Sequence, residues 1–523
     1  MKYLFSKVRL RSHMPIFARS NTAIVLLKGL VTESYFVSIL IVGLMIASCT
    51  KEEFVTSTDA QLGLSVDTLT FDTVFTARGS ATRSFRIRNT HDKFIRISRI
   101  YIEQAQSSFF RMNVDGIAAN QVTDVEIPPN DSIWIFFEVT INPDQPLSLS
   151  PFVITDKVKF ETNGNIQEVI LEAWGQNANY LPDRFSRGEQ RLFSCNMSEW
   201  VWDDPRPYVL FGAVFIDSCE LIIPAGTQIF VHGGFGRNSD GSFYNDGILY
   251  FFRNGRLNVQ GTSDNPVVIQ GDRLEENFQE VAGQWGRIQL GPLSKGNRID
   301  HAIIKNATLG LLVDSLAEVK ITNSQIFNSS SSALAGYQAK ITAENCLFHS
   351  SGGNNVTLIL GGDYDFSYCT LANYGTPSEA LRATNFTCLD GTPLCTEPKA
   401  ARLDMVFRNS IIIGSSRDEI SLVDAVGDQD PSFFQYQFQD CIVKVDELTD
   451  EGGFPDFFNF CDPCINGEEG GNLFVDEDNW DFHLDTLSIA EEMASPIENI
   501  RLDLEGFDRD PERPDIGCYE YRN

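Results

Sequence analysis

Three residues in the middle of the chain could perform acid–base chemistry: the carboxylates Asp300 and Glu344, and the cation Lys305. A glycoside hydrolase needs two carboxylates at a set separation. A polysaccharide lyase needs a base that removes a proton beside a carboxylate, and a cation that stabilises the resulting charge. Two carboxylates and one lysine could serve either reaction, provided that the fold brings them to one face.

The charges around these residues favour a binding protein over an enzyme. Asp363, Asp365, Lys320 and His301 lie in the same stretch, but they do not recur in register as a cluster that includes arginine. The Asn-Thr-Asp and Arg-Ile-Lys signatures of polygalacturonases are absent. Scattered charges are typical of any soluble repeat surface, so we favour a non-catalytic glycan- or protein-binding or scaffold protein. A polysaccharide lyase or glycoside hydrolase is the alternative.

A short repeat between residues 285 and 371 predicts the elements that hold these side chains. Small residues recur every 22 or 23 positions, at Ala302, Ser324, Cys346 and Cys369. Large apolar residues follow two positions later, at Ile304, Ile326, Phe348 and Leu371. Further apolar residues precede by three positions, at Ile299, Ile321, Ala343 and Phe366. Looser copies surround Ser410 and Cys441. The alternation has the period of a strand, and the repeat indicates coils stacked into a parallel β-helix with polar residues outside.

Exposed aromatic side chains on the coils would favour a glycan as the ligand. Phe251, Tyr364 and Tyr374 are the candidates, although the strand pattern buries at least some of them. A third possibility, a purely structural role at the surface, cannot be separated from a binding role by the sequence.

Length and charge set limits on the class of protein. A chain of 523 residues predicts two or three domains. The formal net charge of −30 disfavours nucleic acid as a partner, because that binding depends on lysine and arginine. We predict no cofactor and no metal site.

Eleven cysteines are typical of an exported protein. Removal of one at the head of the chain leaves ten that could pair. Cys346 and Cys369 fall in one column of neighbouring coils, within disulfide reach of each other. A stack of reduced, buried cysteines explains them equally well.

Two further pairs of cysteines are possible disulfides. Cys388 and Cys395 bracket a turn-rich loop that a disulfide could close. Cys461 and Cys464 flank Asp-Pro and resemble half of a zinc or redox motif, but no second pair stands at metal-site spacing. We expect a local disulfide there, or a pairing with Cys518.

The first 48 residues have the composition of an export signal. Basic residues precede an apolar run from Tyr35 to Met45, and Ile46-Ala-Ser-Cys49 follows. This ending resembles the lipobox of bacterial lipoproteins, which implies a lipidated, palmitate-bearing Cys49. An ordinary signal peptide cut near Ser48 is the alternative. The acidic Thr50-Lys-Glu-Glu53 resembles the signal that sends Bacteroidota lipoproteins to the outer face of the outer membrane; a solvated tether is the simpler explanation.

The rest of the chain divides by pattern into a tether (49–61), a β-sandwich (62–177), a solenoid (178–447) and a cap (448–523). Seven short alternating segments separated by turns predict the sandwich. Trp200, Trp202 and Tyr208 could cover the first coil, because the ends of a solenoid need caps. The fold class is therefore all-β: an N-terminal β-sandwich, a parallel β-helix and a C-terminal capping segment.

The whole arrangement resembles the right-handed parallel β-helix lipoproteins of Bacteroidota, whose coils share the pectate-lyase-like fold and which carry an immunoglobulin-like module behind the anchor. The motifs that carry this resemblance are Trp285-Gly-Arg-Ile288, Ile299-Asp-His-Ala-Ile-Ile304, Asp481-Phe-His-Leu484 and Pro514-Asp-Ile-Gly-Cys-Tyr-Glu520. The resemblance implies a right-handed solenoid, a lipid anchor in the outer membrane and exposure at the cell surface. It implies a polysaccharide or another surface protein as partner, and no established reaction.

Overall fold

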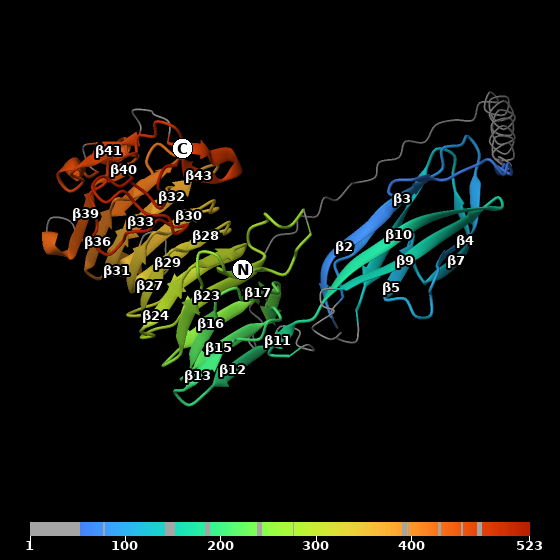
Figure 1. Ribbon diagram of the computed structural model, residues 1–523, viewed down its shortest axis with the longest axis horizontal. Coiled ribbons are helices and arrows are strands. Elements are labelled where there is room, and N and C mark those ends of the chain that lie inside the picture. The colour runs from blue at the N-terminus through green and yellow to red at the C-terminus, as the bar shows by residue number, and fades with distance from the viewer. Residues whose placement is uncertain are drawn as a thin grey trace, which may run out of the picture.

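The computed structural model describes residues 53–76, 79–141, 152–183, 189–237, 243–275, 277–389, 395, 397–426, 430–450, 453–467 and 473–522. The predicted signal segment and Cys49 lie outside these residues. No helix among them is long and apolar enough to cross a membrane. The predicted all-β fold class is confirmed: Figure 1 shows a β-sandwich joined to a coiled stack of parallel strands.

The sandwich is built from two five-stranded sheets. One sheet contains β1 (Gly63–Leu64), β3 (Arg83–Arg88), β8 (Ser132–Val139), β5 (Phe110–Val114) and β6 (Ile117–Ala118). The other contains β2 (Thr68–Phe75), β10 (Asn165–Gln176), β9 (Phe152–Thr162), β4 (Ile95–Ile102) and β7 (Gln121–Ile127). Alternate residues of both sheets point inward, and Phe85 of β3 and Phe160 of β9 meet across the sheets with ring centroids 6.2 Å apart.

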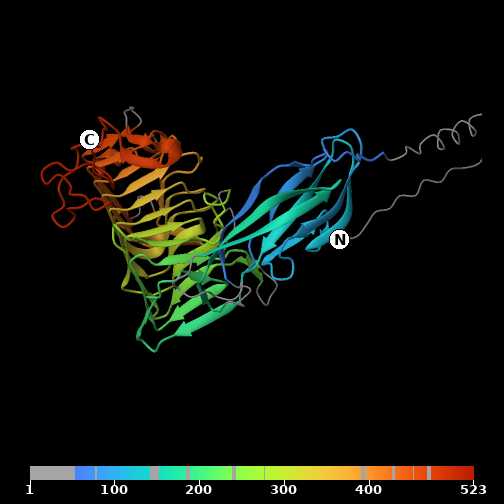
Figure 2. The same ribbon diagram turned by 45° about the vertical axis from the view of Figure 1, so that its right-hand side comes forward.

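Each coil of the solenoid passes through three strips of parallel strands, which are stacked in Figures 1 and 2. The first strip contains β12 (Gln190–Ser194), β15 (Ala213–Asp217), β20 (Ile248–Phe252), β23 (Trp285–Leu290), β26 (Ala307–Val313), the first parts of β29 (Leu334–Glu344) and β31 (Val356–Ser367), β33 (Leu381–Thr384) and β38 (Ile420–Val423). The second strip contains β13 (Glu199–Val201), β16 (Glu220–Pro224), β21 (Arg256–Gln260), β24 (Asn297–Asp300), β27 (Glu318–Thr322), the later parts of β29 and β31, β36 (Leu403–Arg408) and β39 (Phe434–Gln439).

The third strip is a separate 11-stranded sheet. It contains β11 (Asn179–Leu181), β14 (Tyr208–Leu210), β17 (Gln228–Val231), β22 (Val267–Gly271), β25 (Ala302–Lys305), β28 (Gln325–Phe327), β30 (Leu347–His349), β32 (Thr370–Asn373), β37 (Ile411–Gly414), β40 (Cys441–Val443) and β41 (Cys464–Asn466). Short hairpins, β18 (Phe235–Arg237) with β19 (Phe243–Asn245) and β34 (Phe386–Cys388) with β35 (Pro398–Ala400), branch from the coils.

The columns predicted from the repeat are present in the strand register. One apolar column runs through Ile299, Ile321, Ala343, Phe366, Phe407 and Phe438. The other runs through Ile304, Ile326, Phe348, Leu371, Ile412 and Val443. Every member is fully buried. In the small column, the Ser324 hydroxyl donates to the Thr322 carbonyl (2.7 Å) and accepts from the Ala302 amide (3.0 Å), which satisfies backbone groups at the bend.

The bend between the second and third strips uses one residue in the left-handed conformation on each coil. Positive φ angles near 50° occur at His301, Asn323, Asn345, Tyr368, Asn409 and Asp440. Asparagine and aspartate tolerate this conformation better than most residues, because their side chains hydrogen-bond locally. Asn or Asp therefore stands before the small residue in four of these six units for a backbone reason, and His301 and Tyr368 adopt the same conformation in the other two.

Both ends of the stack are covered by aromatic side chains. At the first coil, Trp202 stacks on Tyr208 with ring centroids 4.6 Å apart, and Trp200 packs on the same core, as the sequence predicted. At the last coil, Phe457, in the 3-10 helix η5 (Phe457–Asn459), lies 5.4 Å from the Phe438 ring and closes the column.

Residues 473–522 lie along the side of the stack. They include the hairpin of β42 (Phe474–Asp476) and β43 (Asp481–Leu484) and cover the outer side of β30, β32, β37 and β40. Arg509 anchors this segment: its guanidinium donates to Asn345 Oδ1 (3.0 Å) and Glu520 Oε2 (3.2 Å), and lies 4.0 Å from the centroid of the Tyr368 ring. The capping segment thus closes the end and also seals one face.

The sandwich contacts the first coils through a small apolar cluster. Phe75 of β2 and Phe230 of β17 have ring centroids 5.0 Å apart, and Val209 and Phe211 join them. The Tyr180 hydroxyl donates to the Thr76 carbonyl across the same junction. The outer side of the third strip is therefore occupied by the sandwich at one end and by residues 473–522 at the other.

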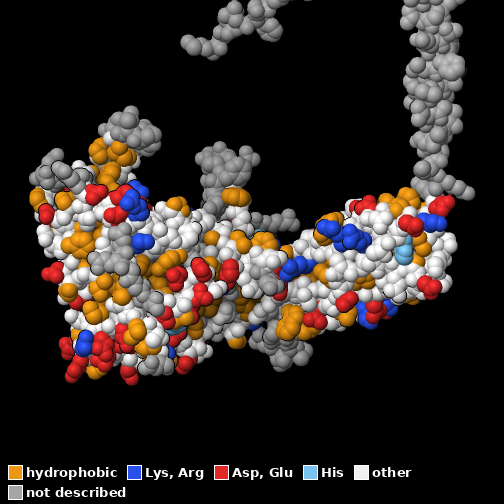
Figure 3. Space-filling model, turned by 90° about the horizontal axis from the view of Figure 1, so that it is seen from above, with side chains coloured by type: hydrophobic (Ala, Val, Ile, Leu, Met, Phe, Trp, Pro, Cys, Tyr) orange, Lys and Arg blue, Asp and Glu red, His pale blue; other side chains and the backbone are white. Residues whose placement is uncertain are grey.

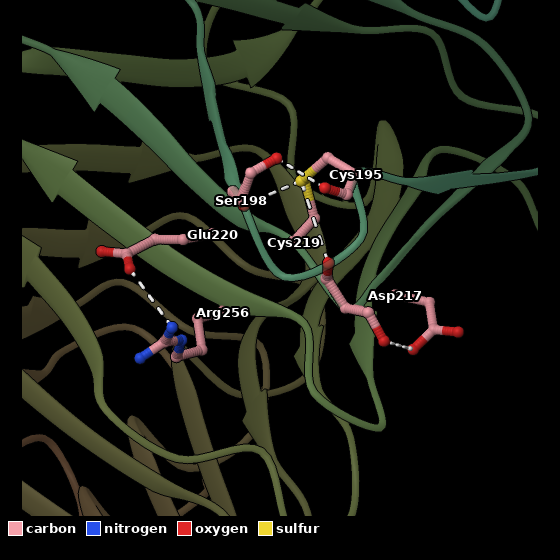
Figure 4. The surroundings of a disulfide bond; sticks show 7 residues. Cys195, Ser198, Asp217, Cys219, Glu220 and Arg256 are labelled. Atoms are coloured by element: carbon pink, nitrogen blue, oxygen red, sulfur yellow. Dashed lines mark hydrogen bonds and ion pairs between the residues drawn. A yellow bond between two sulfur atoms is a disulfide. The ribbon is translucent and has the colours of Figure 1, made fainter.

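Three disulfides are present, and two of them join the cysteines singled out in the sequence, Cys388–Cys395 and Cys461–Cys464. The third, Cys195–Cys219, links the corners of the first two coils; Figure 4 shows it beside Ser198, with the Glu220–Arg256 pair nearby. The remaining cysteines of the described chain are free and buried: Cys346, Cys369, Cys441 and Cys518. Of the two explanations for Cys346 and Cys369, the structure has the reduced stack.

Candidate binding surface

The structure brings Asp300 and Glu344 to one column but places Lys305 elsewhere. Asp300 ends β24, Glu344 ends the second part of β29, and Thr322 lies between them in register. Two strand spacings put their backbones about 9.6 Å apart. Lys305 lies on β25, beyond the left-handed bend, where its Nζ is 3.9 Å from Glu280. The lysine therefore does not share a face with the two carboxylates.

The Asp300 carboxylate is held by its neighbours. Its Oδ1 accepts hydrogen bonds from Thr322 Oγ1 (2.7 Å) and Asn323 Nδ2 (3.0 Å), and His301 Nδ1 lies 2.9 Å away. Burial raises the pKa of Asp300, but the contacts with His301, Thr322 and Asn323 outweigh it, so the pKa lies below its usual value. A carboxyl group that stays ionised cannot be the acid of a hydrolase.

The outward face of the second strip is a ladder of ion pairs. Glu344 pairs with Lys320 at 2.9 Å. Three more pairs also join neighbouring coils, Lys295–Glu318 (2.8 Å), Lys340–Asp363 (2.9 Å) and Arg408–Asp365 (2.7 Å), and Arg402–Asp404 (3.1 Å) lies within one coil. A groove of about 550 Å³ lies among them, lined by residues that include Arg298, Asp300 and Thr342. These charges neutralise one another, and exposed pairs of this kind contribute little to stability.

The aromatic residues expected to face a glycan do not do so. Phe251 and Tyr364 are buried in the solenoid core, and the half-buried Tyr374 stacks on Phe482 of the C-terminal segment. The neighbours of Phe251 take its place, because successive side chains of a strand point to opposite sides. Tyr250 and Phe252 therefore point out of the first strip.

Three aromatic rings form a patch on the outward face of the first strip. Phe215 lies 5.4 Å from Tyr250 and 6.2 Å from Phe252, and Tyr250 and Phe252 are 5.9 Å apart. All three are partly exposed. Gly291 makes room for the Tyr250 ring, because a Cβ at this position would lie 2.6 Å from Tyr250 Cε2. We call Phe215, Tyr250 and Phe252 the aromatic patch.

A chain of polar groups borders the aromatic patch on the next two strands. Arg287 Nε donates to Gln289 Oε1 (2.8 Å), and Gln289 Nε2 donates to Asp314 Oδ2 (3.2 Å). Burial lowers the pKa of Arg287, while nearby Tyr250 and Asp314 act in the opposite direction. Apolar rings beside fixed polar groups are the composition of a small-molecule or sugar site.

A second concavity lies where the sandwich meets the solenoid. It measures about 270 Å³, and His232 Nδ1 lies 2.6 Å from Asp272 Oδ2 at its wall. Asp72 and Arg83 of the sandwich form an ion pair on the opposite wall. The cavity is smaller than most ligand pockets, which measure roughly 300–1,000 Å³.

Within the described residues, no group of three or more His, Cys, Asp or Glu side chains could hold a metal ion. Cys461 and Cys464, which resembled half of a zinc motif, are joined to each other.

Comparisons with known proteins add little. No family model and no curated protein matches the chain. Similar solved structures include a family 123 glycoside hydrolase from Clostridium perfringens: 8% identity, 34% of this chain, 39% of that chain, TM-score 0.16. They also include the catalytic unit of a GH87 alpha-1,3-glucanase from Streptomyces thermodiastaticus: 7% identity, 68% of this chain, 67% of that chain, TM-score 0.24. Scores this low carry no argument about function.

Proposed function

We propose that the protein is a lipid-anchored protein of the outer membrane, exposed at the cell surface, that binds a glycan without cleaving it. The anchor is Cys49, and its support is the Ile46-Ala-Ser-Cys49 ending behind a basic and apolar leader. Three disulfides agree with an oxidising compartment outside the cytoplasm.

The aromatic patch carries the proposal for a glycan. The C–H face of a sugar ring is apolar, and its rim carries hydroxyl groups. The partly exposed rings of Phe215, Tyr250 and Phe252 can pack against the C–H face. Gln289 and Asp314 offer a donor and acceptors to the hydroxyl groups. These three rings of the first strip stay partly exposed, whereas the third strip is covered at both ends.

The non-catalytic part of the proposal rests on the second strip. Asp300 is held ionised, Glu344 is engaged by Lys320, and Lys305 faces another side. The arrangement does not supply the protonated carboxyl group of a hydrolase. Arg298 shares the groove with Asp300, but the lowered pKa of Asp300, whose Oδ1 already accepts two hydrogen bonds, makes this carboxylate a weak base for a lyase.

A panel of plant, algal and host polysaccharides tests both parts at once. The purified chain from Thr50 onward is run on native gels containing each polysaccharide, and the same mixtures are assayed for unsaturated uronates and new reducing ends. We expect retardation without product. Tyr250→Ala should abolish the retardation, while Trp134→Ala, which removes an exposed ring from the sandwich, should leave it unchanged. New ends would establish an enzyme, and silence in both assays would favour a protein partner.

A further inference from the structure

Arg287 is a cation without a carboxylate partner beside the aromatic patch. It points out of β23, and only its Nε has a hydrogen-bond acceptor, Gln289 Oε1, among the described residues. No carboxylate of the described chain lies within ion-pair distance of its guanidinium, since Gln289 separates it from Asp314. Its remaining N–H groups therefore face the surface beside Tyr250.

The other arginines of the coils behave differently. Arg253, Arg256, Arg402 and Arg408 each pair with a carboxylate. Arg191, Arg298 and Arg382 have no such partner among the described residues, but they are exposed and water can solvate them. Arg287 is half-buried, and burial disfavours its charge, so it lacks both full hydration and an anion. A partly desolvated cation is costly unless an anion compensates it.

The position of Arg287 relative to Tyr250 indicates which kind of ligand could carry the compensating anion. Tyr250 pairs in register with Gln289, and Ile248 pairs with Arg287, so Arg287 lies two residues along the strand from the position opposite Tyr250. A sugar ring stacked on Tyr250 would bring a substituent within reach of the guanidinium. A guanidinium binds a planar carboxylate through two parallel hydrogen bonds, which a lysine cannot do.

We infer that Arg287 is an anion-binding subsite of the aromatic patch and selects glycans whose sugars carry a carboxylate. The inference rests on the proposed function, because it takes the patch as a sugar-binding surface. It adds the ligand class: an acidic sugar, recognised by one arginine on a chain whose net charge is strongly negative.

The test uses the full chain purified in detergent and four acidic glycans: alginate, polygalacturonate, hyaluronan and chondroitin sulfate. Each is compared with its carboxyl-reduced form, and chondroitin sulfate also with its desulfated form, by affinity electrophoresis. We expect at least one acidic glycan to bind and carboxyl reduction to weaken that binding about tenfold or more, because a charge-assisted hydrogen bond is lost. Desulfation should have less effect than carboxyl reduction.

Variants assign the preference to the residue. Arg287→Gln should bind the acidic and reduced forms equally, and Arg287→Lys should keep part of the preference because it keeps the charge. Arg298→Gln, which removes the exposed unpaired arginine of the second strip, is the matched control and should behave as the wild type. Unfolding midpoints of all variants establish that they are folded.

The outcomes separate this inference from the proposed function. Binding of acidic and reduced forms with equal strength by the wild type overturns the subsite and leaves glycan binding intact. A preference that survives Arg287→Gln also overturns the subsite. Absence of binding to every form overturns both. A preference that is lost on desulfation but not on carboxyl reduction overturns the inference that Arg287 selects a carboxylate.

Discussion

At the scale of single residues, His349 makes the stability of the solenoid depend on pH. Its ring is buried between Phe327 (4.4 Å) and Phe482 (5.0 Å), and its Nδ1 lies 2.9 Å from Ser350 Oγ. Burial lowers the pKa of His349 to about 3. An unfolded histidine has a pKa of about 6.5, so between these values the unfolded chain binds a proton that the folded chain does not. Stability is therefore fully present above pH 6.5 and falls as the pH decreases.

The lowered pKa of His349 predicts that the free energy of unfolding falls by about 2 kcal/mol between pH 7 and pH 5, since each pH unit below 6.5 costs about 1.4 kcal/mol. Denaturant unfolding at the two pH values measures it. His349→Phe should remove this part of the dependence, whereas His91→Gln, in the sandwich, should retain it. Equal pH slopes for His349→Phe and the wild type would contradict the assignment.

Another residue-scale prediction concerns the glycine beneath the aromatic patch. Gly291→Ala would place a Cβ 2.6 Å from Tyr250 Cε2 and 2.8 Å from the Phe251 carbonyl, so the Tyr250 ring must move. We expect weaker glycan retardation with a loss of stability of about 1–3 kcal/mol, the usual cost of overpacking. Trp134→Ala, the control used for Tyr250→Ala, is again the control for retardation. Unchanged retardation would show that the Tyr250 ring is not the platform.

At the scale of elements, strand β20 separates core from surface by one residue. Phe251 is fully buried, while Phe252 is partly exposed. We expect Phe251→Ala to cost about 3–5 kcal/mol, the range for a buried phenylalanine. Phe252→Ala should cost about 1 kcal/mol, a typical value for a substitution outside the core, and weaken glycan binding instead. Thermal unfolding measures the loss of stability, and native gels measure the loss of glycan binding. A larger loss of stability for Phe252→Ala than for Phe251→Ala would mean that the strand register is shifted by one residue.

The same strand shows how far the sequence alone could go. The coils were predictable because apolar and polar residues alternate in units such as Ile299–Ile304, and only one face of such a strand can be buried. In Ile248-Leu-Tyr-Phe-Phe252 every residue is apolar or aromatic, so no alternation marks the outward side. The sequence therefore indicated Phe251 where the structure exposes Tyr250 and Phe252. Pairing of Cys195 with Cys219 was equally out of reach, because neither lies in the repeats that define the register.

The C-terminal segment gives a second prediction at this scale. Arg509 is buried against Asn345, Glu520 and the Tyr368 ring, so its loss leaves the Glu520 carboxylate without its cation, with only backbone amides as donors. Removing one member of a buried pair costs about 3–5 kcal/mol. We expect Arg509→Ala to detach residues 473–522 locally and to speed their proteolysis. Arg513→Ala, which breaks the exposed pair with Glu492, should cost less than about 1 kcal/mol and change little.

At the scale of the whole molecule, the coverage of the three strips decides which surface is open. The sandwich and residues 473–522 occupy the outer side of the third strip, and the second strip carries charges that already pair with one another. Among the residues that the structure describes, the first strip combines partly exposed rings with Arg287, a half-buried cation that has no carboxylate partner. The proposal that the aromatic patch binds a glycan therefore depends on how the domains cover the strips more than on any motif.

The net charge of −30 then predicts how binding responds to salt. Figure 3 shows many acidic side chains over the solenoid on the face in view, so an acidic polymer is repelled at long range while Arg287 attracts it at contact. Salt screens the repulsion first, because the Debye length falls from about 30 Å at 0.01 M to about 8 Å at 0.15 M. Retardation by an acidic glycan should therefore be equal or stronger at 150 mM than at 10 mM salt, and binding of a neutral glycan should not change. A steep loss of binding with salt would instead indicate an extended basic surface, which is the behaviour of nucleic-acid-binding proteins.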